Sequence, residues 1–202
     1  MEHAVSRTGC RVTGLTLSAK QAQYTRQRLL ASGLANRAEV RLQDYRDCEG
    51  PFTKVVSIEM FEAVGEENWR GFFNHLRELL VPSGQAMIQV ITIDETRFER
   101  YRHNADFIQA YIFPGGMLPS PTIFRERAEG SGLVLADEFA FGRDYERTLL
   151  HWERSFVENW ARIRTLGFDE RFHRMWRYYL HYCATGFRTG TIDVYQFHLE
   201  RP

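Results

Sequence analysis

Hydrophobic and polar positions change period along the first half of the chain, which predicts strands alternating with helices. Strand-like patterns occupy residues 10–17, 38–44, 53–60 and 85–93. Helical spacing follows Ser18, a favoured N-cap residue, and ends at Gly33. A second helix, over 66–80, carries its apolar residues at Trp69, Phe72, Phe73, Leu76, Leu79 and Leu80. The order β-α-β-β-α-β predicts an α/β sheet with parallel strands.

The pattern changes after Asp94. Residues 95–130 are rich in Phe, Tyr, Arg, Gly and Pro, and we interpret them as an insertion or lid over the sheet. The remaining predicted elements are a strand at 133–141, helices at about 146–166 and 169–186, and a strand at 191–201. With no repeat and no linker, the pattern predicts one domain over residues 1–202, in which 94–130 and 146–186 form lid and ligand-pocket elements.

Composition excludes several classes of protein. Net charge is zero at pH 7, so no basic field favours nucleic acid. Three widely spaced cysteines, Cys10, Cys48 and Cys183, form neither a disulfide framework nor a zinc motif. The chain shows no signal peptide and no 18-residue apolar run, from which we expect a cytoplasmic protein.

Acidic and polar residues follow four of the predicted strands, at TLS (16–18), QDY (43–45), EMFE (59–62) and TID (92–94). Ligands of open α/β sheets bind beyond the carboxyl ends of parallel strands, so these positions predict a cofactor crevice. Helix capping is the alternative for each residue taken singly. Glu59 and Glu62 stand out because burying an unpaired carboxylate costs several kcal/mol. Their position directly after a buried strand predicts an active site.

Six stretches carry a family resemblance: GLTLSAKQ, LQDYRD, VVSIEMFEAVG, FIQAYIFPGGMLPS, RMWRYYLHYCATGFR and IDVYQFHLER. In this order they resemble the cyclopropane-fatty-acyl-phospholipid synthases and the mycolic acid cyclopropane synthases, over nearly the whole chain. The resemblance implies a class I, Rossmann-like, S-adenosylmethionine (SAM)-dependent methyltransferase. It implies methylene transfer to cis double bonds of phospholipid acyl chains, at a membrane surface on its cytoplasmic side and with no nucleic acid partner.

The same resemblance implies the site residues. The catalytic candidates are Glu62, Tyr179 and Cys183. A bicarbonate ion, the expected proton acceptor, is assigned to Glu62, Gln89, Ile91 and Tyr179. SAM is assigned to Thr16, Leu17, Ser18, Gln21, Gln43, Asp44 and Tyr45. A carboxylate and a phenol can orient a small anion, and the carboxylate of Asp44 can accept from the adenine amino group.

Three assignments keep an alternative. Glu59 is either part of the site or structural. Cys183 is either a catalytic group or a core cysteine, because its apolar neighbours would raise the pKa of the thiol. Residues 107–120 line an acyl channel, lie against the bilayer, or form a packed lid without lipid contact.

Two features depart from the family pattern. No glycine-rich GxGxG-like loop is present, and we expect the chain to be an N-terminally incomplete enzyme that lacks the first, central strand. Gln89 stands where many members carry a histidine, so activity should depend less on a histidine titration.

The competing functions are methyl transfer without ring closure, to a lipid or another small molecule, and a non-catalytic remnant. A nicotinamide-dependent dehydrogenase is disfavoured because its GxGxxG fingerprint is also absent.

Overall fold

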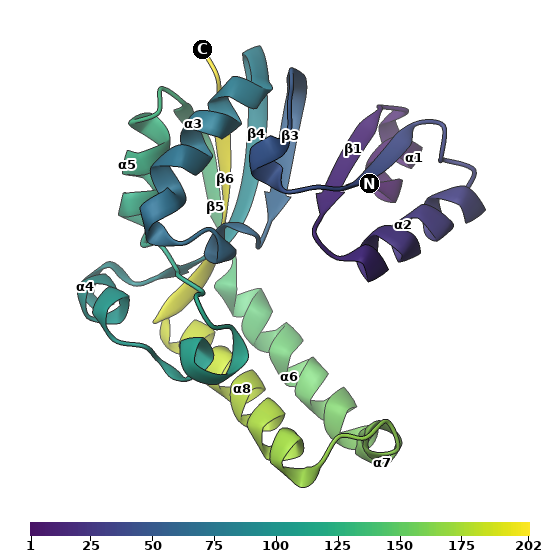
Figure 1. Ribbon diagram of the computed structural model, residues 1–202. Coiled ribbons are helices and arrows are strands. Elements are labelled where there is room, and N and C mark those ends of the chain that lie inside the picture. The colour runs from purple at the N-terminus through teal and green to yellow at the C-terminus, as the bar shows by residue number, and fades with distance from the viewer. The chain divides into compact units, whose positions relative to one another are not determined.

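The computed structural model describes residues 1–202, and the chain divides after Gly50 into two units, Met1–Gly50 and Pro51–Pro202 (Figure 1). The single domain predicted from the sequence pattern stays a prediction. The strands divide in the same way, because β1 and β2 form one sheet and β3 to β6 form another.

The first unit contains a short parallel sheet and two helices. Its elements are α1 (Glu2–Thr8), β1 (Val12–Thr16), α2 (Ala19–Ala31), β2 (Ala38–Leu42) and a 3₁₀ turn at Tyr45–Asp47. As predicted, Ser18 caps α2 by accepting from the backbone nitrogen of Gln21. Gly9 ends α1 in the left-handed conformation, at φ +68°. The core of the unit consists of Val5, Ala22, Leu29, Ala38 and Val40.

The second unit contains a four-stranded mixed sheet. Its strands are β3 (Phe52–Ile58), β4 (Leu80–Ile93), β5 (Val134–Ala140) and β6 (Ile192–Glu200), in the order β3-β4-β6-β5. β3 and β4 are parallel, as predicted, whereas β6 is antiparallel to both β4 and β5. β4 begins five residues earlier than the predicted 85, because Leu80 is fully buried and pairs with Phe52.

Helices α3 (Trp69–Leu79) and α5 (Pro121–Glu129) supply the aromatic core of this unit. The Phe124 ring of α5 stacks on Phe197 of β6 with centroids 4.1 Å apart, and it meets Phe73 of α3 at 5.0 Å. The sequence analysis places α5 in the insertion, but it packs on the sheet. Only α4 (Glu95–His103) and a π-helical turn at Ile108–Ile112 remain as insertion elements.

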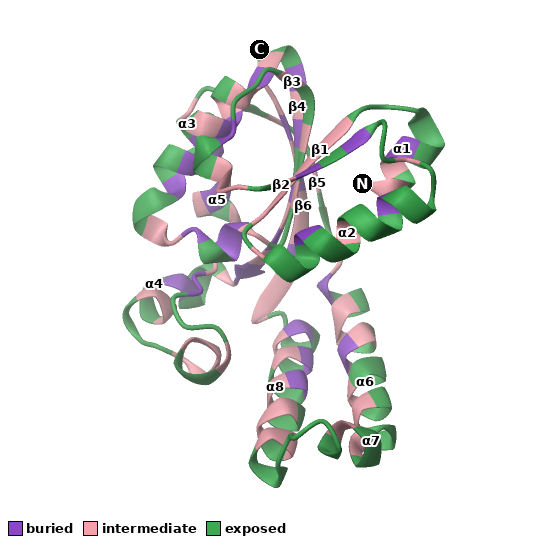
Figure 2. Cartoon of the chain, turned by 45° about the vertical axis from the view of Figure 1, so that its right-hand side comes forward, coloured by how far each residue is buried: buried purple, intermediate pink, exposed green.

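A helical hairpin extends from one end of this sheet (Figure 1). It consists of α6 (Gly142–Glu158), α7 (Trp160–Arg164) and α8 (Glu170–Thr189), with α6 and α8 side by side. α6 starts four residues before the predicted 146, because the Asp193 carboxylate accepts from the backbone nitrogen of Gly142 and holds the first turn on β6. Figure 2 shows that buried residues concentrate at the sheet-proximal end of the hairpin and exposed residues toward its tip.

The β1–β2 pair has no neighbouring strand on either edge, and the β3–β4 pair has none beside β3. β1 pairs only with β2, and β3 pairs only with β4. On β3 the apolar side chains of Val56 and Ile58 remain 66% and 64% exposed. No helix of the chain has the length and apolar character needed to span a bilayer.

Candidate active site

Glu62 lies buried just beyond the carboxyl end of β3. It occupies a 3₁₀ turn (Phe61–Ala63), which is anchored by the fully buried Phe61 ring against Trp69 and Phe124. One carboxyl oxygen, Oε1, accepts a 2.7 Å hydrogen bond from the backbone nitrogen of Ile91, while Oε2 is buried without a partner. Burial raises the pKa of Glu62 to about 7. The carboxyl group can therefore both hold and release a proton near neutral pH.

Glu59 lies three residues before Glu62 and is held by hydrogen bonds of both its backbone and its side chain, which fit the structural alternative and the site alternative alike. Its backbone has φ +52°, in the left-handed region, and its nitrogen donates to the Gln89 carbonyl oxygen at 2.8 Å. The side-chain oxygen Oε1 accepts from Gln89 Nε2 at 2.9 Å and from the Tyr145 hydroxyl. A left-handed non-glycine residue is uncommon and costs about 1–3 kcal/mol, which this network offsets.

Gln89 is held in one orientation by three side chains. Its Nε2 donates to Glu59 Oε1 and, at 3.0 Å, to the Tyr145 oxygen, while its Oε1 accepts from Gln196 Nε2 at 2.9 Å. Both amide hydrogens are thus engaged within the protein. A bicarbonate contact from Gln89, as the resemblance implies, would require one of these bonds to be released.

Tyr145 and Gln196 contact Gln89 here, and neither is predicted from the sequence. Burial raises the pKa of the Tyr145 hydroxyl above its usual range, and the neighbouring Glu59 carboxylate adds to the shift. Gln196 lies on the predicted last strand, where polar and apolar residues alternate. This alternation predicts the face of the sheet to which its side chain belongs, but it does not identify the residue that the side chain contacts.

Tyr179 and Cys183 lie on α8 in an apolar cluster centred on Leu149, Leu180, Ala184, Phe187 and Val194. Ile91 and Tyr145 pack against the same cluster. Because the backbone nitrogen of Ile91 also binds Glu62, the predicted residues Glu62, Ile91 and Tyr179 lie at one end of the unit, next to Gln89. Burial raises the pKa of Tyr179 to about 12.

Burial likewise raises the pKa of Cys183 to about 12. Its thiol is protonated at neutral pH, and the thiolate is the nucleophilic form of cysteine. The core-cysteine alternative therefore fits its surroundings better than a nucleophile does.

The segment from α4 to α5 makes one hydrogen bond to Glu62, one within itself and one to the hairpin. The Met117 nitrogen donates to the Glu62 carbonyl oxygen at 2.9 Å, and the Leu118 nitrogen donates to the Tyr101 hydroxyl at 3.2 Å. From the hairpin, the Tyr182 hydroxyl donates to Asp106 Oδ2 at 3.1 Å. This segment contains FIQAYIFPGGMLPS, for which acyl-channel lining, bilayer contact and a packed lid without lipid contact remain the alternatives.

The residues assigned to SAM gather at one edge of the first unit. β1 and β2 run parallel and end opposite each other at Thr16 and Leu42, so the residues that follow both strands share an edge. The Gln43 nitrogen donates to the Thr16 carbonyl oxygen at 3.1 Å, and the Thr16 hydroxyl donates to Gln21 Oε1 at 2.7 Å. Leu17 is 74% exposed there. Exposed polar groups beside an apolar side chain fit a ribose and methionine moiety.

Asp44 is already engaged within the chain. Both carboxylate oxygens accept from the Arg46 guanidinium, at 3.0 Å and 2.8 Å, and Oδ1 also caps the turn at Tyr45–Asp47. These hydrogen bonds lower the pKa of Asp44 to about 2. An adenine contact would have to share these oxygens with Arg46.

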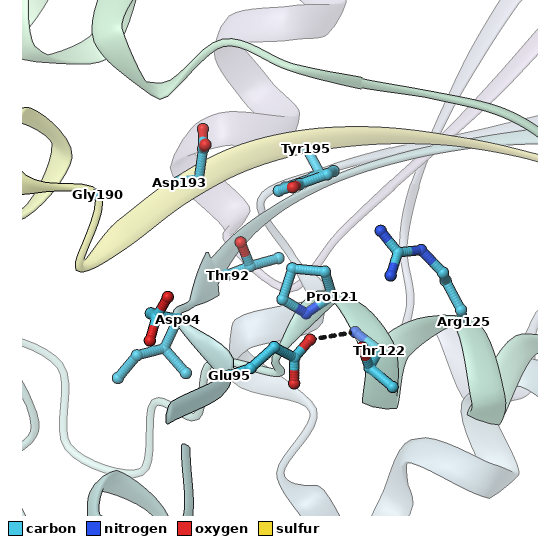
Figure 3. A pocket seen from close by; sticks show the side chains of 10 residues that line it. Thr92, Asp94, Glu95, Pro121, Thr122, Arg125, Gly190, Asp193 and Tyr195 are labelled. Atoms are coloured by element: carbon cyan, nitrogen blue, oxygen red, sulfur yellow. Dashed lines mark hydrogen bonds between the residues drawn. The ribbon is translucent and has the colours of Figure 1, made fainter. Parts of the chain in front are cut away.

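Helix capping is the observed role of three strand-end residues, Ser18, Asp44 and Asp94. Asp94 lines a cleft of about 330 Å³ beyond the carboxyl end of β4, where Glu95 Oε1 accepts from the Thr122 nitrogen (Figure 3). Glu62, in contrast, caps no helix and keeps an unpartnered oxygen. Its second carboxyl oxygen is therefore available to a proton or to a ligand.

Comparison with known proteins identifies the family of the chain. The family model described as mycolic acid cyclopropane synthetase matches residues 1–197. The chain belongs to this family. It shares the α/β fold of the class I SAM-dependent methyltransferases, as predicted, and the family is one of lipid-modifying methyltransferases.

Three relatives show the range of the family. The chain is 42% identical to the tuberculostearic acid methyltransferase UfaA1 of Mycobacterium tuberculosis, over 96% of this chain and 45% of that protein. It is 36% identical to the cyclopropane-fatty-acyl-phospholipid synthase of Escherichia coli, over 94% and 47% of the two chains. The mycolic acid cyclopropane synthase CmaA1, solved with SAH and CTAB, superposes with a TM-score of 0.89 at 30% identity, over 98% of this chain and 73% of CmaA1. The chain spans about half the length of the first two relatives.

Proposed function

We propose that this protein transfers a one-carbon unit from SAM to a cis double bond in a phospholipid acyl chain and closes a cyclopropane ring. The observation that carries the proposal is Glu62: a buried carboxyl group with one unpartnered oxygen and a pKa of about 7, at a strand end lined by aromatic residues. An alkylation that ends with loss of a proton needs such an acceptor site in an apolar chamber.

The atoms of the proposed reaction balance. SAM supplies an electrophilic methyl group that bonds to one alkene carbon, and S-adenosylhomocysteine leaves. The resulting cation loses one proton from the added methyl carbon, and the ring closes with a net gain of one CH₂. The Tyr179 ring can stabilise a nearby cation through its quadrupole, by roughly 0.5–2 kcal/mol.

The proton acceptor we propose is bicarbonate beside Glu62. The unpartnered Glu62 Oε2 fits this ion, because a buried acceptor without a donor is rare and an O–H group of bicarbonate would satisfy it. The Tyr179 hydroxyl would supply a donor to the same ion. Ile91 acts through Glu62, since its nitrogen orients the carboxyl group.

The SAM site we propose lies at the edge of the first unit formed by Thr16, Leu17, Ser18, Gln21 and Gln43, with Asp44 and Tyr45 next to them. The fold supports this assignment, and the relative CmaA1 was solved with SAH.

Methyl transfer without ring closure is the second candidate. The relative with 42% identity is named a methyltransferase, whereas the one with 36% identity is named a cyclopropane synthase. The two outcomes differ only in which proton the cation loses.

Lipid analysis of expressing cells tests the proposal. The 202-residue chain and a version extended through any reading frame upstream of Met1 are expressed in a host that makes monounsaturated phospholipids but no cyclopropane synthase. A gain of one CH₂ with resistance to ozonolysis shows the ring, and the same gain with ozonolysis retained shows methylation alone. Glu62→Gln should abolish product, whereas Glu126→Gln, an exposed change on α5, should not. Folded protein without product in either version would support the non-catalytic alternative.

A further inference from the structure

The far end of the helical hairpin presents apolar side chains to solvent. The loop between α7 and α8 carries Leu166, 72% exposed, and Phe168, 42% exposed. Between them Gly167 has φ +96°, a conformation that glycine adopts without strain. We call residues 160–176 the hairpin tip.

These exposed side chains rest on a packed base. The Phe168 ring meets Phe172 at 4.4 Å, and Trp160 meets His173 at the same distance. Phe172 in turn stacks on Trp176 at 5.7 Å, and Asp169 caps α8 through the Phe172 nitrogen. These ring contacts hold the loop in place, so Leu166 is exposed although the loop around it is well packed.

The hairpin tip is locally basic although the whole chain has no net charge. Four exposed arginines surround the loop, and none of them forms an ion pair: Arg162, Arg164, Arg171 and Arg174. The only acids in the tip are Asp169 and Glu170. Asp169 is engaged as the α8 cap, and Glu170 accepts from the Trp160 indole at 3.3 Å.

We propose that the hairpin tip docks onto an anionic phospholipid bilayer, with Leu166 and Phe168 in the interface and the arginines on lipid phosphates. Guanidinium groups pair with phosphate oxygens in bidentate fashion, and their aliphatic stems cover apolar surface. A second copy of the chain is a poorer occupant, since a two-fold contact would bring the unpaired arginines against each other. The choice of a bilayer rests on the proposed function, in which the substrate is a phospholipid.

Docking at this point would connect the membrane to the candidate site along one helix. α8 begins in the tip and carries Tyr179 nine residues after Glu170. At 1.5 Å per residue this separation is about 14 Å along the helix axis. Bilayer contact is also one of the three alternatives for residues 107–120. The tip is a separate surface, and its positive charge is complementary to that of an anionic lipid.

Vesicle flotation tests the proposal with the 202-residue chain and without any turnover. Vesicles of equal parts phosphatidylglycerol and phosphatidylethanolamine are compared with phosphatidylcholine vesicles. We expect binding to the anionic vesicles that weakens with salt, and binding about tenfold weaker for Leu166→Asp or for Arg162→Gln with Arg164→Gln. Leu30→Asp is the matched control, because Leu30 is also 72% exposed but lies on α2. Far-UV circular dichroism and melting curves verify that each variant is folded.

The possible results separate the alternatives. Absence of wild-type flotation, or equal flotation of Leu166→Asp and wild type, overturns the docking proposal. A dimer that Leu166→Asp converts to a monomer, with vesicle binding unchanged, assigns the tip to a second copy instead. An alkylation assay on detergent-dispersed phospholipid is independent of docking, so it shows separately whether the proposed function fails.

Discussion

The backbone nitrogen of Ile91 donates a 2.7 Å hydrogen bond to Oε1 of Glu62, whereas Oε2 of the same carboxyl group is buried and has no partner. One oxygen is therefore fixed by β4, and the other is free for a proton or a ligand. The Ile91 bond orients the carboxyl group, and burial raises its pKa to about 7.

Glu62 should make the stability of the protein depend on pH. Burial raises its pKa from 4.5 to about 7, so the folded protein holds a proton there that the unfolded chain has lost between these values. The contribution of this group to the free energy of unfolding is complete below about pH 4.5. It decreases as the pH rises from about 4.5 through 7 and does not change further above that. The loss is about 3 kcal/mol, at 1.36 kcal/mol per pKa unit.

Urea unfolding at several pH values between 5 and 8 measures this effect. Glu62→Gln should flatten the pH dependence, and Glu126→Gln should leave it as in the wild type. A Glu62→Gln profile as steep as that of the wild type would show that another group is responsible.

Glu59 should tolerate glycine better than alanine. At φ +52° a Cβ atom is strained and glycine is not, while both substitutions remove the same side-chain hydrogen bonds. Glu59→Gly should be more stable than Glu59→Ala by about 1 kcal/mol in denaturant unfolding. At Glu126, within α5, the order should reverse by a similar amount, because glycine weakens a helix. Equal stability of the two Glu59 variants would argue against the left-handed backbone.

Thiol reactivity should separate the three cysteines. Cys10 is exposed, Cys48 is buried, and burial raises the pKa of Cys183 to about 12. Iodoacetamide at pH 8 should label Cys10 at least about tenfold faster than Cys183, since the thiolate is the reacting form. Peptide mass spectrometry over time measures the rates. Rapid labelling of Cys183 in the folded protein would reveal an activated thiol and would reopen its catalytic assignment.

Asp44 and Arg46 should have opposite effects on cofactor binding. If Asp44 accepts from the adenine amino group, Asp44→Ala weakens S-adenosylhomocysteine binding about tenfold, the value of one good hydrogen bond to a charged group. Arg46→Ala frees both carboxylate oxygens and should maintain or tighten binding. Isothermal titration calorimetry gives both dissociation constants. If Arg46→Ala weakens binding as much as Asp44→Ala does, binding depends on the intact Asp44–Arg46 ion pair and not on a free carboxylate.

Local signals in the sequence predicted most of the elements. Ser18 and Gly33 mark the ends of one helix through a short-range hydrogen bond and a backbone preference, which need no knowledge of the fold. The position of α5 was missed because its nine residues follow an aromatic, proline-rich segment. That this helix packs on the sheet depends on the Phe124 contact with Phe197, far away in the chain.

The site was predictable only in part for the same reason. Glu62 could be found because an acid after an apolar strand is unusual. Tyr145 reaches Glu59 across 86 positions, and Gln196 reaches Gln89 across 107. Such pairings are decided by strand register and by the rotation of α6, which the hydrophobic pattern does not specify.

Glu62 is bound on two sides at once: its side chain to Ile91 and its carbonyl oxygen to the Met117 nitrogen. Any displacement of the Gly115–Met117 stretch would therefore pull on the backbone of the residue whose carboxyl group Ile91 orients. The segment after α4 and the buried acid are in this way mechanically coupled through a single peptide carbonyl.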